Sequence, residues 1–218
     1  MHIEFLVEDS SGAAFLEVII PKIIGDLNNP HTWRIHKYKG AGKIPKGLTS
    51  ATDAQKRILL DQLPSRLIGY GNTPGIDAVV VVVDTDRRDC VGFLAELQAL
   101  LARCNPKPNT LFRLAIEEIE AWYLGDGQAL LAAYPRAKKK VLNNYDQDSV
   151  CGTWELLADA VHPKGATAIK KAGWPSSGQL KHEWAKNIPA HMNIDQNVSP
   201  SFKKFVEGLK RITSEVAA

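Results

Sequence analysis

The stretch that decides the fold is Ala78-Val79-Val80-Val81-Val82-Val83, and it ends at Asp84-Thr85-Asp86. A continuous run of apolar, β-branched residues is typical of a strand that is buried on both faces of a parallel sheet. Three further segments have the composition of strands. They are Ile3–Val7, Thr32–Tyr38 and Leu111–Ile116.

Segments with helical periodicity separate these strands. They are Ala13–Ile24, Asp53–Ile68 and Cys90–Arg103. We expect Ser10 or Ser11 to cap the first of these helices, and Pro64 to break or kink the second. Because strands alternate with helices, the sequence predicts an α/β fold in which helices flank a mostly parallel sheet.

The pattern changes near Asp126. A short acidic helix is expected over Glu117–Leu124, directly after the last strand. Beyond Asp126 the sequence remains helical but is less regular, because several prolines interrupt it. We therefore divide the chain into an α/β domain, residues 1–126, and a helical C-terminal extension, residues 127–218, that packs on it.

The composition is ordinary for a globular protein, with 44% hydrophobic and 23% charged residues among 218. No apolar run approaches the roughly 18 residues that a membrane span needs, and the chain starts with a strand pattern rather than a signal segment. Cys90, Cys104 and Cys151 are odd in number and too widely spaced for a zinc motif, which favours a reducing compartment. We expect a cytoplasmic protein that does not contact a membrane.

Charge alternates along the chain, although its net value is only +3. Residues 1–30 and 73–126 each have a net charge of −4, whereas residues 31–72 have +6 and residues 127–218 have +5. A metal site needs clustered acids, and a polyanionic substrate needs basic walls near them. Solvated charge on an ordinary surface would give the same pattern, so this observation leaves both interpretations open.

Acidic side chains follow three of the four predicted strands. They are Glu8 after the first, Asp84 and Asp86 after the third, and Glu117, Glu118 and Glu120 after the fourth. The carboxyl ends of parallel strands meet at the edge of the sheet where ligands bind, so we expect all six acids there. Asp84 and Asp86 are two residues apart in what we expect to be extended chain, and would point to the same side.

Such a cluster needs a compensating cation. Two carboxylates about 4 Å apart repel by roughly 4 kcal/mol at an effective dielectric constant near 20. Ligands that are all oxygen and mostly acidic select Mg²⁺ or Mn²⁺ over zinc. An Asp-x-Asp after a strand can also be a turn in which Asp caps the next helix, but the matching Glu8 favours a metal site.

Three motifs together resemble a known family. They are Glu4-Phe5-Leu6-Val7-Glu8, Val83-Asp84-Thr85-Asp86-Arg87 and the segment from Ala115 to Asp126 that contains Glu117-Glu118-Ile119-Glu120. The chain resembles an uncharacterised bacterial Toprim-like family, a domain of unknown function related to the Toprim domains of OLD-type nucleases. Its members are often encoded beside ABC-type ATPases in antiphage-defence settings. The similarity extends through Gly152-Thr153-Trp154-Glu155 and Lys181-His182-Glu183-Trp184-Ala185 to Ser199-Pro200-Ser201-Phe202.

The resemblance implies a Toprim-like (Rossmannoid) catalytic domain over residues 1–126 and a nuclease that hydrolyses phosphodiester bonds, with DNA favoured over RNA. Asp84 and Asp86 would hold one or two Mg²⁺ or Mn²⁺ ions, and Glu8 would ligate a metal or act as general base. Glu118 or Glu120 would complete a second metal site. The position after the first Glu is usually Gly in Toprim domains. Here it is Asp9, which is either an added ligand or a sign of different loop geometry.

Basic residues supply the expected substrate contacts. Lys43 belongs to a Gly/Lys-rich loop, residues 39–47, that resembles a P-loop but lacks the Ser/Thr after Gly42-Lys43. Arg87 follows the Asp-x-Asp motif and would neutralise a phosphate, unless it is an exposed cation at a helix start. Lys181 is a candidate through the resemblance alone, with a solvated helical lysine as the alternative.

Two other functions compete with the nuclease. One is a catalytically weak, Toprim-shaped binding or regulatory partner of an ABC-type ATPase. The other is a metal-dependent transferase or phosphatase that uses the Asp-x-Asp motif on a nucleotide-linked substrate. Toprim nucleases that act with ATPases often form multimers, so the resemblance also makes an oligomer an expectation.

Overall fold

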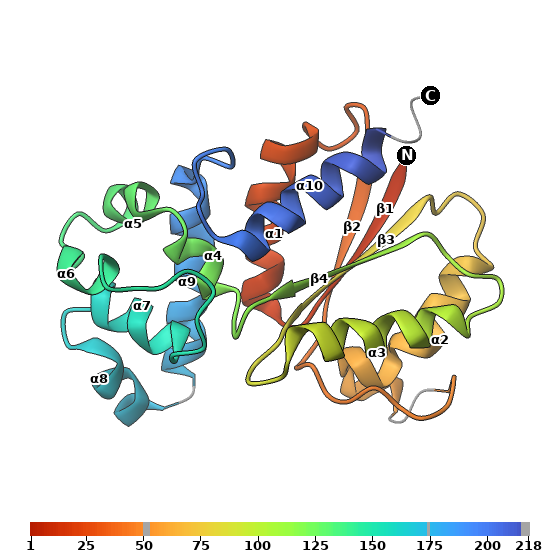
Figure 1. Cartoon of the computed structure of the whole chain (residues 1–218), viewed down its shortest axis with the longest axis horizontal. Coiled ribbons are helices and arrows are strands. Elements are labelled where there is room, and N and C mark those ends of the chain that lie inside the picture. The colour runs from red at the N-terminus through yellow and green to blue at the C-terminus, as the bar shows by residue number, and fades with distance from the viewer. Residues whose placement is uncertain (50–52, 174, 215–218) are drawn as a thin grey trace.

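The computed structural model describes residues 1–49, 53–173 and 175–214, and its centre is a four-stranded, all-parallel sheet. The strands lie in the order β2-β1-β3-β4 (Figure 1). They are β1 (His2–Val7), β2 (Thr32–Lys37), β3 (Ala78–Asp84) and β4 (Thr110–Ala115). All four predicted strands are present, each within about one residue of its predicted ends, and the predicted α/β class is confirmed.

Helices cover both faces of this sheet. The helix α1 (Ser10–Ile24) packs on one face, and α2 (Leu59–Gly71) with α3 (Cys90–Ala102) packs on the other. Alternate valines of β3 enter the two layers: Val80 and Val82 pack on the α1 side, whereas Val79, Val81 and Val83 pack on the α2 side. The uninterrupted valine run therefore reflects burial on both faces.

Two predicted helix starts are wrong. The residue that caps α1 is Asp9 rather than Ser10 or Ser11, and its carboxylate accepts hydrogen bonds from the backbone N–H of Gly12 at 2.7 Å and the hydroxyl of Ser11 at 2.7 Å. In place of one helix from Asp53, a short 3₁₀ turn, η1 (Ala54–Lys56), precedes α2. Arg57 separates them because its φ of 54° is left-handed and cannot continue a helix. Pro64 does not end α2, which continues past it to Gly71.

The predicted acidic helix also begins later than expected. The helix α4 (Glu120–Leu124) starts at Glu120, three residues beyond the predicted start. Glu117 has a φ of 59°, and this left-handed conformation interrupts any helix that would include it. Glu117 and Glu118 therefore lie in the loop between β4 and α4.

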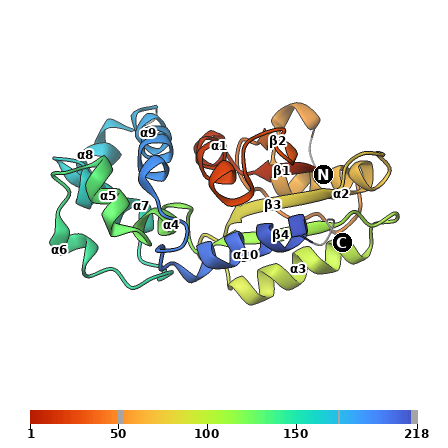
Figure 2. The same cartoon turned by 90° about the horizontal axis from the view of Figure 1, so that it is seen from above.

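The C-terminal half is helical, as predicted. Its helices are α5 (Gly127–Ala133), α6 (Lys139–Leu142), α7 (Thr153–Val161), α8 (Gly165–Ala172), α9 (Ser176–His191) and α10 (Pro200–Ser214). The helices α5 to α8 form a lobe beyond the carboxyl end of β4, while α10 returns along β4 (Figures 1 and 2). The helix α9 joins the two parts because it packs against α1 and also against α5.

One buried aromatic cluster contains residues from both predicted parts of the chain, 1–126 and 127–218. The ring of Trp122 on α4 lies 5.7 Å from Phe202 and 5.1 Å from Phe205, both on α10, measured between ring centroids. Phe15 on α1 contacts Trp122 at 5.5 Å, and Trp184 on α9 belongs to the same cluster. The C-terminal helices therefore complete the hydrophobic layer on the α1 side of the sheet.

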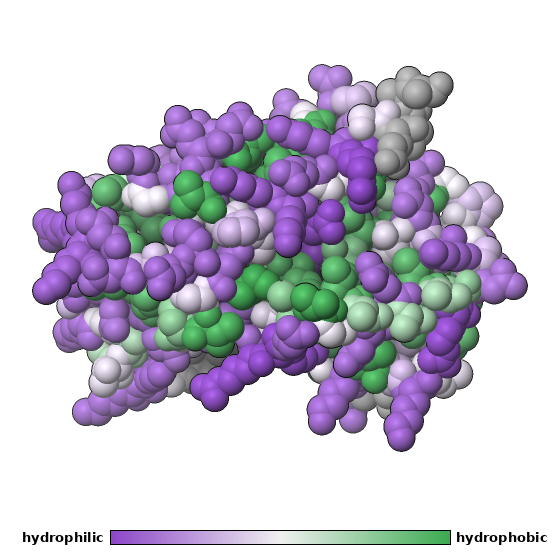
Figure 3. Space-filling model, in the orientation of Figure 1, coloured by the Kyte–Doolittle hydropathy of each residue, from purple (hydrophilic) through white to green (hydrophobic). Residues whose placement is uncertain are grey.

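The outer surface has one apolar groove over β4. Figure 3 shows apolar side chains gathered between α3 and α10, and the groove there has a volume of about 320 Å³. Its lining includes Val91, Leu94, Leu114 and Ile116. Among the described residues, no helix has both the length and the apolar character that crossing a bilayer requires.

Candidate metal centre

The sheet topology brings the ends of β1 and β3 together. The chain leaves β1 for the edge strand β2, whereas it leaves β3 for the opposite edge strand β4, so the direction of winding reverses between β1 and β3. Open α/β sheets bind ligands in the crevice outside the carboxyl ends of the strands at such a switch point. Glu8 follows β1 and Asp84 ends β3, which places both carboxylates at this position.

Glu8 is a partly buried carboxylate without a full set of partners. Its Oε2 atom is buried and has no hydrogen-bond partner. Burial raises the pKa of Glu8 to about 7, and the nearby charges of Asp86 and Asp9 add to the effect. Glu8 therefore holds its proton to a higher pH than an exposed glutamate does.

Asp84, at the end of β3, interacts electrostatically with acids from two other elements. Burial raises the pKa of Asp84 well above its usual range, and the charges of Glu8 and Glu120 raise it further, whereas Lys181 lowers it. Carboxyl groups from β1, β3 and α4 thus act on one another. The predicted gathering of Glu8, Asp84 and Glu120 at one sheet edge agrees with this arrangement.

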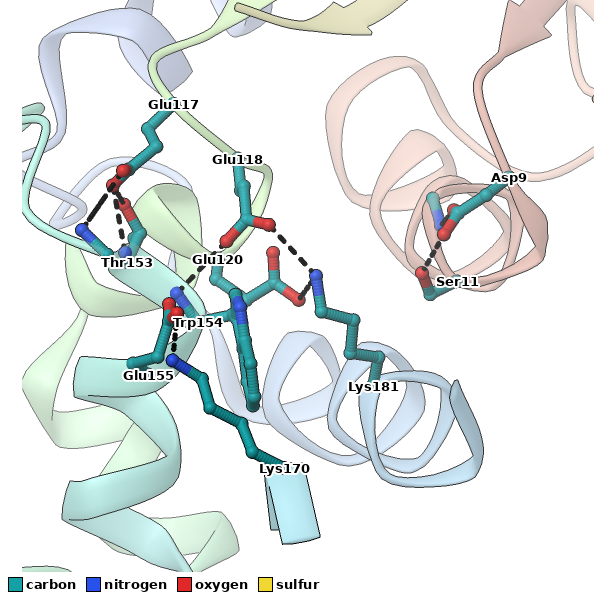
Figure 4. A network of polar contacts seen from close by, with 12 residues as sticks. Asp9, Ser11, Glu117, Glu118, Glu120, Thr153, Trp154, Glu155, Lys170 and Lys181 are labelled. Carbon is teal, nitrogen blue, oxygen red and sulfur yellow. Dashed lines mark hydrogen bonds and ion pairs between the residues drawn. The ribbon is translucent and has the colours of Figure 1, made fainter. Parts of the chain in front are cut away.

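Lys181 from α9 lies among the acids that follow β4. Figure 4 shows its ammonium between the carboxylates of Glu118 and Glu120, with Nζ–Oε1 distances of 3.1 Å and 3.5 Å. Burial lowers the pKa of Lys181, but the carboxylates of Glu120, Glu118 and Asp84 outweigh burial and hold the pKa above its usual value. Lys181, predicted as a substrate contact, is placed here as a counter-ion of the acids.

The two glutamates that hold Lys181 differ in their remaining contacts. The Oε2 atom of Glu118 accepts a hydrogen bond from the backbone N–H of Trp154 at 3.1 Å. Burial raises the pKa of Glu118 to about 7, with a contribution from Glu120. Glu120 is almost wholly buried, and its Oε2 atom has no partner.

Tyr123 is a neighbour that the sequence did not single out. It lies three residues after Glu120 and therefore on the same side of α4, and its buried hydroxyl has no hydrogen-bond partner. Burial raises the pKa of Tyr123 far above its usual value, and the charges of Glu120, Asp9 and Asp84 act in the same direction. The hydroxyl thus lies close to the acids.

Asp86 differs from the prediction that it points to the same side as Asp84. Its φ of 50° is left-handed rather than extended, and 63% of its side chain is exposed beside Arg88, whose Nη2 lies 3.4 Å from it. The intervening Thr85 is buried, and its hydroxyl accepts a hydrogen bond from the backbone N–H of Glu117 at 2.7 Å. The three residues of the Asp-x-Asp motif therefore have different roles. Asp84 belongs to the group of acids, Thr85 connects the loops after β3 and β4, and Asp86 is exposed to solvent.

Glu117 has a structural role. Its carboxylate accepts hydrogen bonds from the backbone N–H groups of Cys151, Gly152 and Thr153 and from the hydroxyl of Thr153, at the start of α7. Burial raises the pKa of Glu117, but these hydrogen bonds outweigh burial and hold the pKa below its usual value. Glu117 thereby attaches the helical lobe to the loop after β4.

A cleft of about 670 Å³ opens beside the acids. Its polar lining includes Asp86, Arg87, Glu118, Glu155 and Lys170, together with the ring of Trp154. Glu155 and Lys170 form an ion pair at 2.8 Å, with the ammonium 5.5 Å from the centre of the Trp154 ring. Sequence reasoning missed Lys170, whereas Trp154 and Glu155 lie in a motif that carries the family resemblance.

The predicted substrate contacts are divided between this cleft and other places. Arg87 is exposed and lines the cleft. Lys43 is exposed in the loop after β2, where its backbone N–H donates to Asp61 at 2.8 Å, and it does not line the cleft. The same loop contacts Glu8, because the backbone N–H of Gly40 donates a hydrogen bond to the backbone carbonyl oxygen of Glu8 at 3.0 Å.

The carboxyl groups have the chemistry that a hard divalent cation prefers in its ligands. The group contains four buried or partly buried carboxyls, those of Glu8, Asp84, Glu118 and Glu120. The ammonium of Lys181 pairs with Glu118 and Glu120, and one oxygen each of Glu8 and Glu120 lacks any partner among the described residues. Buried polar atoms without partners are rare in proteins and often indicate an ion or water. Within the described part of the chain, no three His, Cys, Asp or Glu side chains are arranged closely enough to hold a metal ion. The acids therefore have the ligand chemistry of a Mg²⁺ or Mn²⁺ site but are not arranged as one.

A family model matches residues 7–210, which include every acid described above. The chain belongs to the family described as a domain of unknown function, DUF4276. The DUF4276 match extends from the end of β1 into α10 and covers both the sheet and the helical lobe. Comparisons with curated proteins and with solved structures each returned no match.

Proposed function

We propose that this DUF4276 protein is a Mg²⁺- or Mn²⁺-dependent nuclease of the Toprim type that hydrolyses phosphodiester bonds. The observation that supports this function best is the pair of buried, unpartnered carboxylate oxygens, Glu8 Oε2 and Glu120 Oε2, beside Asp84 at the switch point of the sheet. A cleft of about 670 Å³, lined by the neighbouring acids Asp86 and Glu118, has Arg87 and Lys170 in its wall.

The chemistry of the site follows from the individual side chains. Asp84, Glu8 and Glu120 would hold the cation, which supplies positive charge to a phosphoryl oxygen and lowers the pKa of bound water. If the other acids hold the cation, Glu8 would instead accept the proton of the attacking water as general base. Arg87 would bind the phosphodiester in the cleft, and Lys181 would keep Glu118 and Glu120 in position.

The biological setting extends this proposal. We propose that the substrate is DNA, that an ABC-type ATPase is the partner protein, that the protein forms oligomers, and that it works in the cytoplasm as the effector of an antiphage defence system. The family resemblance supports the substrate, the partner and the oligomer, and the three unpaired cysteines support the compartment.

A cleavage assay tests the proposed function. Plasmid and single-stranded DNA are incubated with the protein and Mn²⁺, with and without the neighbouring ATPase, and the products are separated on a gel. We expect Asp84→Asn to abolish cleavage, whereas Glu96→Gln, which removes an exposed carboxylate from α3, leaves it unchanged. Cleavage that continues undiminished in Asp84→Asn, or in excess EDTA, would exclude the proposed site.

One observation favours the alternative, a catalytically weak binding or regulatory partner of the ATPase. Lys181 already provides the acids with a cation through its two ion pairs. This alternative predicts no cleavage with any divalent metal, together with stable co-purification with the ATPase that Asp84→Asn does not weaken. The nuclease predicts the opposite result in the cleavage assay.

A further inference from the structure

A second polar cavity lies between β1, β2 and α2. Its volume is about 510 Å³, and its lining includes Glu4, Arg34, His36, Arg66 and Tyr70. Glu4 lies on the same face of the sheet as Leu6, which packs on the α2 side. Because a strand rises about 3.3 Å per residue, Glu4 is roughly 13 Å from Glu8 along β1. The cavity is therefore separate from the candidate metal centre.

Glu4 is the one acidic residue among the described residues that line this cavity, and both of its carboxylate oxygens contact histidines. Glu4 is 4% exposed, and its two oxygens lie 3.2 Å from His2 Nε2 and 2.5 Å from His36 Nε2. The other ring nitrogen of His2 is 2.8 Å from the hydroxyl of Thr32. These contacts orient the two imidazoles and engage both oxygens of the carboxylate.

Two guanidinium groups in the cavity have no anionic partner. Arg34 stands beside Glu4 in the β1–β2 register, and Arg66 projects from α2. Neither arginine takes part in any ion pair found among the described residues. Arg66 hydrogen-bonds the hydroxyl of Tyr38. A cavity lined by two guanidiniums outside these ion pairs, and by one carboxylate whose oxygens both contact imidazoles, favours an anion.

Tyr70 lines the same cavity as the two arginines. Burial raises the pKa of Tyr70 far above its usual value, and Glu4 and Tyr38 raise it further, whereas Arg66 and Arg34 lower it. Both guanidiniums therefore act on the same hydroxyl, which remains protonated and can donate a hydrogen bond. The wall of the cavity thus contains at least three side chains that can donate hydrogen bonds.

We propose that this cavity binds a phosphate group, held by Arg34 and Arg66 with the Tyr70 hydroxyl as a further donor. A phosphate monoester carries about −1.5 to −2 charges at pH 7, which two guanidiniums match better than they match a carboxylate. The planar guanidinium fork also fits two phosphate oxygens at once. The phosphate belongs either to a free phosphorylated small molecule or to the end of a nucleic-acid strand, and the second source rests on the proposed nuclease function.

Binding measurements on the whole chain test this proposal in buffer that contains EDTA, so that no cleavage occurs. Inorganic phosphate is titrated by calorimetry, and 5′-phosphorylated and 5′-hydroxyl oligonucleotides are compared by fluorescence anisotropy. We expect Arg34→Gln and Arg66→Gln each to weaken phosphate binding by about tenfold, which is ~1.4 kcal/mol. Lys203→Gln, which removes an exposed charge from α10, should leave the affinity unchanged.

Each outcome decides the proposal. Phosphate binding that both arginine variants weaken supports the cavity. A preference for the 5′-phosphorylated oligonucleotide, lost in both variants, then identifies the strand end, and equal oligonucleotide affinities identify a free phosphorylated ligand. No saturable binding of inorganic phosphate, or equal binding by wild type and both variants with native thermal unfolding, would overturn it. Failure of the nuclease proposal leaves this result untouched, because Asp84→Asn should bind phosphate as the wild type does.

Discussion

At the residue scale, the carboxyl of Glu8 links the stability of the protein to pH. Its pKa is about 7 in the folded chain and 4.5 in an ordinary environment, so the folded state holds its proton more tightly. The stability from this proton is complete below about pH 4.5 and is lost as the pH rises through 7. Above that pH the buried carboxylate is charged and costly in free energy, and a bound cation would offset this cost.

We predict that Glu8→Gln stabilises the metal-free protein at pH 8 by up to about 3 kcal/mol and has little effect at pH 4. The amide keeps the shape of the side chain and removes the charge that burial disfavours. Urea unfolding in EDTA between pH 4 and pH 8 measures this difference, with Glu96→Gln as the exposed control. A variant that is less stable than wild type at pH 8 would contradict the raised pKa.

Thr85 connects two loops of the site through a single buried hydrogen bond. Its hydroxyl accepts the hydrogen bond from the N–H of Glu117, at a buried contact between the loops after β3 and β4. We predict that Thr85→Val lowers the free energy of unfolding by about 1–3 kcal/mol, because it leaves a buried N–H without an acceptor. Thr85→Ser retains the hydroxyl and should lose much less. Equal stability of the two variants in urea would show that the contact contributes nothing.

At the element scale, Asp9 explains how α1 begins beside the acids. Both of its oxygens accept hydrogen bonds within the first turn, from Gly12 and Ser11. The departure from the Gly that Toprim domains usually carry is therefore a helix cap in this chain. Of the two interpretations that the sequence left open, an added ligand or a different loop, the cap contacts favour the second.

We predict that Asp9→Ala destabilises the protein by about 1 kcal/mol, as loss of a helix cap usually does. Asp9→Asn keeps an oxygen for the Gly12 N–H, and should retain both the stability and any DNA cleavage. Thermal unfolding and the plasmid assay measure the two effects separately. Cleavage that disappears in Asp9→Asn while stability is preserved would make Asp9 a metal ligand.

Sequence patterns predict the strands of this protein better than the starts of its helices. The strands were predicted closely because alternation and β-branched runs are local properties. The starts of α2 and α4 were wrong because Arg57 and Glu117 adopt left-handed conformations, which carry no composition signal in non-glycine residues. Asp86 was assigned to the wrong side for the same reason.

At the scale of the whole molecule, the C-terminal helices complete the core as well as the site. Phe202 and Phe205 pack on Trp122, and Lys181 pairs with Glu118 and Glu120. We predict that a chain truncated after residue 126 does not unfold cooperatively, because the apolar surfaces of α1 and α4 are then exposed. Near-ultraviolet circular dichroism and dye binding distinguish this state from the native fold. A sharp two-state transition of residues 1–126 would show an independent domain.

The sequence by itself determined the parallel α/β sheet and the edge at which Glu8, Asp84 and Glu120 gather. Both follow from periodicity and from the rule that parallel strands place their carboxyl ends together. Only the tertiary structure decided the roles within that group: Glu117 became the cap of α7, Lys181 became the counter-ion, and Asp86 turned to solvent. The physical reason is that these roles depend on contacts such as those of Glu117 with Thr153 and Glu118 with Lys181, between residues far apart in the chain, and local patterns carry no record of such contacts.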